Sequence, residues 1–118
     1  MAILLLNITG CSKNEPLTLL KLVNKNVPNV TQIDIRYGNG QSNTIRDTEN
    51  VKEILKQIKD IEVYESTNHE NKGYLYMMDF TDGTNTIRMD SNLKINNKQY
   101  ATDKSLNELN NTILNLKS

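Results

Sequence analysis

Apolar side chains follow two different periods along this chain, and the change from one period to the other constrains the fold more than any other feature. Ile33, Ile35 and Tyr37 alternate with polar residues, as in a strand with one buried face, and residues 74–80 repeat the pattern. Between them, apolar residues recur every three or four positions from 51 to 61, as on the buried side of an amphipathic helix. The sequence therefore predicts a mixed fold of strands and helices.

Turn and cap residues separate these segments. Gly38-Asn39-Gly40, Asp82-Gly83 and Asn96-Asn97 are typical of hairpin turns. Asp47 is a candidate N-cap for the helix at 51–61, and Ser105-x-x-Glu108 matches a capping box ahead of a C-terminal helix. We expect an α+β fold, with an antiparallel sheet of about five or six strands and two amphipathic helices packed on one face. The C-terminal helix is expected to bury Leu106, Leu109, Ile113 and Leu116.

Composition narrows the possible functions. The 118 residues suffice for one domain, and the formal net charge of zero gives no overall field toward nucleic acid. One Cys and one His exclude an internal disulfide framework, a Cys-based zinc cluster and a pair of His ligands. Asp79, Asp82 and Asp90 lack the spacing of a calcium loop. We expect no metal, no cofactor and no nucleic-acid partner.

The first sixteen residues divide into an apolar and a polar part. Ala2–Leu6 are apolar, Ile8-Thr9-Gly10-Cys11 follow, and Ser12–Pro16 are polar. At about 1.5 Å per residue, the first ten residues cover about 15 Å, which is half of a hydrocarbon core. An apolar run that ends in small residues is typical of the end of a signal peptide. No Lys or Arg precedes Lys13, so we expect a basic start of that signal to be missing from this sequence.

Ile8-Thr9-Gly10-Cys11 resembles the bacterial lipobox. The resemblance implies that Cys11 is diacylglyceryl-modified, that the chain is cut before it, and that acyl chains anchor the mature protein outside the cytoplasmic membrane. The alternative is a buried N-terminal strand with an ordinary Cys. The layout of strands and helices over roughly residues 30–118 resembles uncharacterised small lipoprotein domains of low-GC Gram-positive bacteria.

The expected organisation has three parts. Residues 1–10 are a signal-peptide-like segment, and residues 11–29 hold the lipidated Cys with a tether and a short helix. Residues 30–118 form the α+β domain. In the short helix, Leu17, Leu20 and Val23 have helical spacing, with Pro16 at its first position.

Few side chains are candidates for binding. Tyr74, Tyr76 and Tyr100 are weak candidates for a binding surface, because Tyr is enriched at interfaces, although the same stripe is typical of a core beneath helices. His69 lies in a polar loop, where it is either a pH-sensitive contact or an ordinary solvated residue. The helix at 51–61 also carries Lys52, Lys56 and Lys59 on one face. These lysines either contact anionic headgroups or belong to a solvated face of mixed charge.

These observations predict a membrane-anchored extracytoplasmic lipoprotein that acts as a binding or accessory module without catalysis. Its partners would be the membrane, through the anchor at Cys11, and an envelope protein, peptide or wall component. Two alternatives stay open. One is a small envelope hydrolase with an unrecognised site, and the other is an assembly module that pairs through a free edge strand.

Overall fold

The computed structural model describes residues 16–67 and 73–116, which form one seven-stranded antiparallel sheet with three helices. The strands follow the order β2-β1-β4-β5-β6-β7-β3 across the sheet, so the first hairpin forms one edge and the short β3 forms the other. The α+β class predicted from the sequence is confirmed. The element bounds are α2 Leu19–Asn26, β1 Gln32–Tyr37, β2 Ser42–Ile45, α3 Thr48–Lys59, β3 Tyr64–Glu65, β4 Tyr76–Thr81, β5 Thr86–Asp90, β6 Lys94–Ile95, β7 Lys98–Ala101 and α4 Asn107–Leu114.

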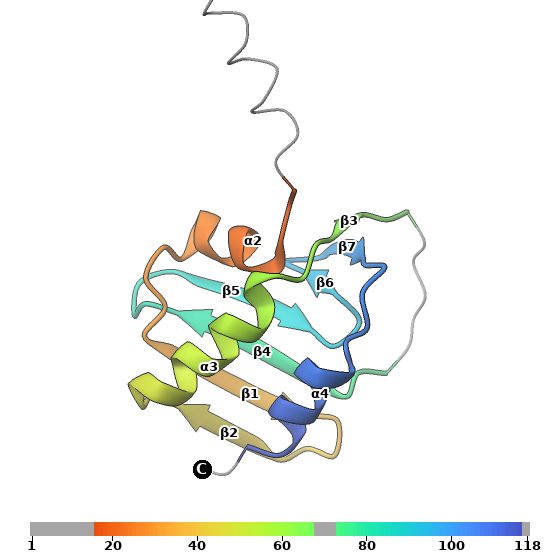
Figure 1. Cartoon of the computed structure of the whole chain (residues 1–118). Helices are drawn as coiled ribbons and strands as arrows, with labels where there is room; N and C mark the ends of the chain where they lie inside the picture. The colour runs from red at the N-terminus through yellow and green to blue at the C-terminus, as the bar shows by residue number, and fades with distance from the viewer. Residues whose placement is uncertain (1–15, 68–72, 117–118) are drawn as a thin grey trace, which may run out of the picture.

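The helices lie on one face of the sheet, as Figure 1 shows for α3 and α4. Strand alternation buries every second side chain beneath them, including Ile33 and Ile35 on β1 and Met78 and Phe80 on β4. Tyr37 at the end of β1 and Tyr76 at the start of β4 connect the sheet to α4 through hydrogen bonds of their hydroxyl groups. Tyr37 donates its hydroxyl to the carbonyl oxygen of Ile113 at 2.8 Å.

Helix α3 follows the sequence prediction closely. The Asp47 carboxylate accepts the backbone N–H of Asn50 at 3.1 Å, and Val51, Ile54 and Ile58 are buried. Helix α4 buries Leu109 and Ile113 as expected, but it begins without the predicted capping box. Leu106 occupies the N-cap position without a side-chain bond, and the Ser105 hydroxyl accepts the N–H of Asn107 at 3.2 Å rather than that of Glu108.

Helix α2 corrects the expected domain boundary at residue 30. Thr18 caps it by accepting the N–H of Lys21 at 3.2 Å, and Leu19 and Val23 are fully buried against the core. The buried side of α2 therefore differs from the expected stripe of Leu17, Leu20 and Val23, because the helix begins three residues later than Pro16 predicts. Backbone bonds from Leu19 and Val63 also tie this segment to the strand that enters β3. The packed unit begins at about Leu17 rather than Val30.

Two strand features differ from the expectation. Strand β3 was not expected, and it pairs with β7 so that Tyr64 lies opposite Ala101. The β4–β5 hairpin has a four-residue loop from Asp82 to Asn85 rather than the two-residue turn that Asp82-Gly83 alone suggests. The sheet thus has seven strands instead of five or six, and α2 brings the number of helices to three.

Candidate functional site

The face of the sheet opposite the helices carries the candidate site. On β1, β4 and β5, the side chains that point away from the core are polar at every position except Met77. This is the expected result of period-two alternation in a two-layer domain, because the three helices lie on the other face. The outward side chains of these strands are Gln32, Asp34, Arg36, Met77, Asp79, Thr81, Thr86, Arg88 and Asp90.

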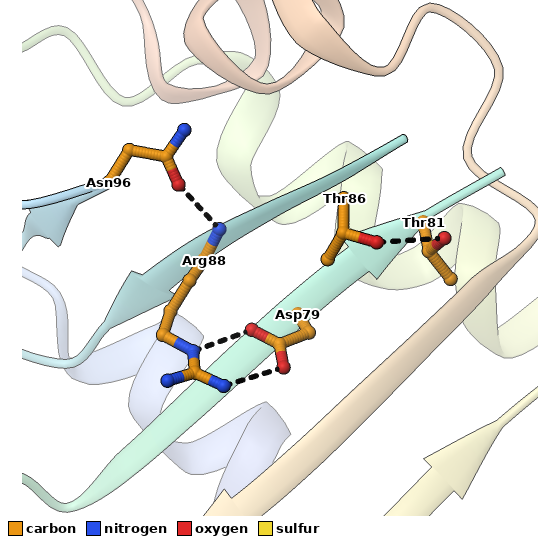
Figure 2. A network of polar contacts seen from close by, with 5 residues as sticks. All are labelled: Asp79, Thr81, Thr86, Arg88 and Asn96. Atoms are coloured by element: carbon orange, nitrogen blue, oxygen red, sulfur yellow. Dashed lines mark hydrogen bonds and ion pairs between the residues drawn. The ribbon is translucent and has the colours of Figure 1, made fainter. Parts of the chain in front are cut away.

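An Asp–Arg pair occupies the middle of this uncovered face. Asp79 on β4 lies directly opposite Arg88 on β5, and the guanidinium donates Nε to Oδ1 at 2.8 Å and Nη2 to Oδ2 at 3.0 Å. Figure 2 shows this two-pronged contact. The hydrogen bonds and then the negative charge of Asp79 raise the pKa of Arg88 above its usual value. Both side chains are solvated, so the pair adds orientation more than stability.

A second polar chain lies beside this pair. Asp34 on β1 is directly opposite Asp79, and Gln32 donates Nε2 to both oxygens of Asp34 at 3.0 and 3.2 Å. Arg46 in turn donates Nε to the amide oxygen of Gln32 at 3.0 Å. Two carboxylates in directly opposite positions repel each other. Here each carboxylate has its own donor, because the Gln32 amide binds Asp34 and the Arg88 guanidinium binds Asp79.

A shallow, open hollow of about 480 Å³ lies over β4, β5 and the β6–β7 turn. Asn96 shapes one wall, because its side-chain oxygen accepts the backbone N–H of Arg88 at 3.2 Å (Figure 2). Asn96 and Asn97 both have positive φ, as the predicted tight turn requires. Charges of both signs and one apolar surface meet in this hollow, whose lining is Met77, Asp79, Thr86, Arg88, Asp90, Lys94, Asn96 and Asn97.

All three arginines of the chain lie on this face, although lysines far outnumber them in the sequence. Arg36 is exposed on β1, Arg88 lines the hollow, and Arg46 directly follows β2. The Arg36 side chain has no hydrogen-bond partner among the described residues. A planar guanidinium presents five donors in a fixed fork, so it recognises carboxylates and other paired acceptors better than an ammonium does.

The turn beside the hollow is built by its own side chains. The Asp82 carboxylate accepts the backbone N–H groups of Asn85 at 2.7 Å and Thr84 at 2.8 Å. These bonds lower the pKa of Asp82, with the Asn85 bond as the largest cause. Thr86 donates its hydroxyl to Thr81 at 3.1 Å and closes the end of the hairpin (Figure 2). Asp82 is therefore a turn residue, and among the described residues no cluster of carboxylates, His or Cys is placed to hold a metal ion.

The structure places two of the three candidate tyrosines in the core. Tyr76 is 1% exposed and Tyr100 is 7% exposed, and both belong to the hydrophobic core. Tyr76 donates its hydroxyl to Asn110 at 2.6 Å, and burial, followed by the charge of Asp90, raises the pKa of Tyr76. These two rings are out of reach of a surface ligand, which corrects the expectation of a binding role. Their burial agrees with the alternative interpretation of the sequence, in which the tyrosine stripe belongs to the core.

Tyr74 is half-buried and lies just before β4, so it does not continue that stripe within the strand. It lines a second open hollow, of about 470 Å³, between the β1–β2 turn and the end of α4. The exposed side chains of Leu75 and Leu114 form the apolar part of this hollow. Tyr74 is thus the one candidate tyrosine that a ligand could contact.

Several sequence predictions lie outside the described residues, among them the lipobox-like Ile8–Cys11 and the loop residue His69. Of the helices in residues 16–67 and 73–116, none is long and apolar enough to cross a membrane. Fold and site together define a two-layer α+β domain with one uncovered, polar sheet face. No family model, curated protein or solved structure matches the chain.

Proposed function

We propose that this chain is an extracytoplasmic lipoprotein, anchored to the bacterial cytoplasmic membrane through Cys11, and that its domain is a binding or accessory module. The observation that carries the binding role is the uncovered sheet face, which holds all three arginines and a hollow of about 480 Å³. The observation that supports the anchor is the lipobox-like Ile8-Thr9-Gly10-Cys11. A fixed, charged face on a rigid sheet suits recognition of an envelope partner.

The charge pattern indicates the kind of partner. Cations and carboxylates are mixed on this face, and no described residue binds the guanidinium donors of Arg36. A partner that carries both acidic and donor groups, such as a protein or peptide segment, complements this pattern better than a uniformly charged polymer. Met77, half-buried among these charges, adds an apolar contact to the lining of the hollow.

The same geometry supports the proposal that the module has no catalytic role. Asp34 and Asp79 lie opposite each other, as an acid–base pair would, but both oxygens of Asp79 accept from Arg88. The hollow is also open to water, whereas catalytic electrostatics depend on excluding it.

The anchor is tested by metabolic labelling with a fatty-acid analogue, comparing the full chain with its Cys11→Ala variant in a bacterial host. Because no Lys or Arg precedes Lys13, the chain is expressed behind a functional signal n-region. Label and membrane association on the wild type alone are the expected result. An unlabelled, cytosolic wild type would remove the anchor and the localisation together.

The binding face is tested by placing a photo-crosslinking amino acid at Lys94, which lines the hollow, or at Lys56, on the outer side of α3. Both are exposed lysines, so they form a matched pair that differs in which face they sample. We expect a discrete adduct from position 94 that is weakened by Arg88→Glu. Adducts from position 56 alone, or from neither position, would remove the sheet face from the proposal.

A further inference from the structure

The free edge of strand β2 carries unpaired backbone N–H and C=O groups. Residues 33, 35 and 37 of β1 point their backbone groups at β2, as the bond from the Tyr37 N–H to the Gln41 carbonyl at 2.8 Å indicates. By alternation, the N–H and C=O groups of Ser42 and Thr44 point away from β1. They have no partner within the described part of the chain. Such a row is a template for another strand.

No residue of β2 hinders pairing with another strand at this edge. Its four residues include no Pro, no Lys and no other charge, which are the usual devices against edge pairing. The opposite edge of the sheet differs. Strand β3 has only two residues, and an ion pair between Glu65 and Lys98 at 3.2 Å lies across it. Of the two edges, β2 is therefore the one prepared for pairing.

Asn43, at the centre of this segment, adds an independent observation. It is 8% exposed, its side chain points to the helix side of the sheet, and its Oδ1 is buried without a hydrogen-bond partner among the described residues. A buried polar atom without a partner costs stability and calls for an explanation. A carboxamide is self-complementary, because it holds both a donor and an acceptor.

We propose that two copies of this chain pair through β2, antiparallel, with Asn43 opposite its own copy on the two-fold axis. In this register Ser42 lies opposite Thr44, and Arg46 lies opposite Gly40, so no like charges meet. Asn43 then forms a non-hydrogen-bonded pair, with Cα atoms about 4.5 Å apart. A rotation of each side chain out of the core lets its carboxamide donate Nδ2 to the Oδ1 of the other copy.

The pairing has a consequence for the proposed binding face. A two-fold axis between antiparallel strands runs perpendicular to the sheet, so both copies keep their helices on the same side. Their uncovered faces, with all their arginines, then form one continuous surface. A single interface of four residues per copy is small, so we expect a weak dimer in solution that appears at the upper end of a concentration series. Confinement of anchored chains to a membrane would raise their effective concentration.

The register is tested by disulfide trapping in the full chain carrying Cys11→Ala, which removes its one native thiol. Asn43→Cys should form an intermolecular disulfide under mild oxidation, because the paired Cα atoms lie within bridging range. Thr44→Cys is the matched control. Its Cα atoms would be about 8 Å apart in this register, beyond that range. Trapping at 44 but not at 43 would refute the register.

Association itself is measured by sedimentation over a concentration series on the same Cys11→Ala background. Thr44→Pro removes an outward N–H that bonds to no described residue, so the fold should survive, as a thermal melt can verify. We expect it to weaken association by at least about tenfold, because two donors are lost across the axis. Thr44→Val, which keeps the backbone donor, should associate like the parent.

Three results would overturn the proposal, even where Asn43→Cys fails to fold. One is a parent that remains monomeric at every concentration, and another is a Thr44→Pro variant that still associates. The third is trapping of residue 43 to a different protein in cells, with no disulfide to a second copy. That result would assign the edge to a foreign strand instead.

Discussion

Replacement of Leu19 by Ala tests whether α2 belongs to the folded domain or to a tether. Leu19 is 0% exposed, and its N–H donates to the carbonyl oxygen of Ile61 at 3.0 Å. Removing the branched end of this side chain costs about 2.4 kcal/mol in transfer alone, at about 0.8 kcal/mol per carbon. The cavity that remains brings the expected loss to about 3 kcal/mol.

Leu17→Ala is the matched control. Leu17 lies two residues earlier, is 38% exposed, and contributes its carbonyl oxygen to a bond with the N–H of Val63 that alanine retains. Its loss should change the free energy of unfolding by less than about 0.5 kcal/mol. The two variants thus share chemistry and neighbourhood and differ in burial.

The assay is equilibrium unfolding in urea, followed by circular dichroism, on the chain with Cys11→Ala. The Leu19→Ala midpoint should fall without a change in slope, and the melting temperature should drop by about 10 °C or more. If both leucine variants unfold together with the parent, α2 does not pack as described. The boundary expected at residue 30 would then be restored.

Three further perturbations test the site and its supports. Wild-type stability should fall as pH rises above 10.0, because the folded pKa of Tyr76 is raised and the unfolded chain ionises first; Tyr76→Phe should flatten this decline in urea titrations at high pH. The folded pKa of Asp82 is lowered, so its ionised carboxylate stabilises the fold above pH 3.8, and this stabilisation is lost as the pH falls through the folded pKa. Asp82→Asn should therefore destabilise the fold at neutral pH and have little effect in strong acid. A double-mutant cycle on Asp79→Asn and Arg88→Met should give a coupling energy of about 1 kcal/mol or less, since both groups are solvated.

Local periodicity was enough to predict the elements whose buried side is long. Helix α3 has buried residues over three turns and an Asp47 cap, so its pattern has one solution. Helix α2 has leucines on several sides, and its two fully buried residues could be selected only by the partners they meet in the sheet and α3. Strand β3, with two residues, is too short to carry a period at all.

The central pair of the site depended on a hairpin register that the sequence left undefined. A two-residue turn at Asp82-Gly83 would place Thr81 opposite Thr84, and Asp79 would then face Thr86. The actual loop extends to Asn85 because the Asp82 carboxylate binds two backbone N–H groups, which shifts the return strand by two residues. Only then does Arg88 lie opposite Asp79.

The same alternation that defines the core also determines which face is free, but solvation alone does not account for what that face contains. Met77 is apolar at an outward position, between Arg36 on one neighbouring strand and Asp90 on the other. A solvent-facing strand has no need of a thioether there, whereas a flexible, polarizable side chain adapts to the surface of a partner. Met77 and the clustered arginines therefore distinguish this face from an ordinary solvated one.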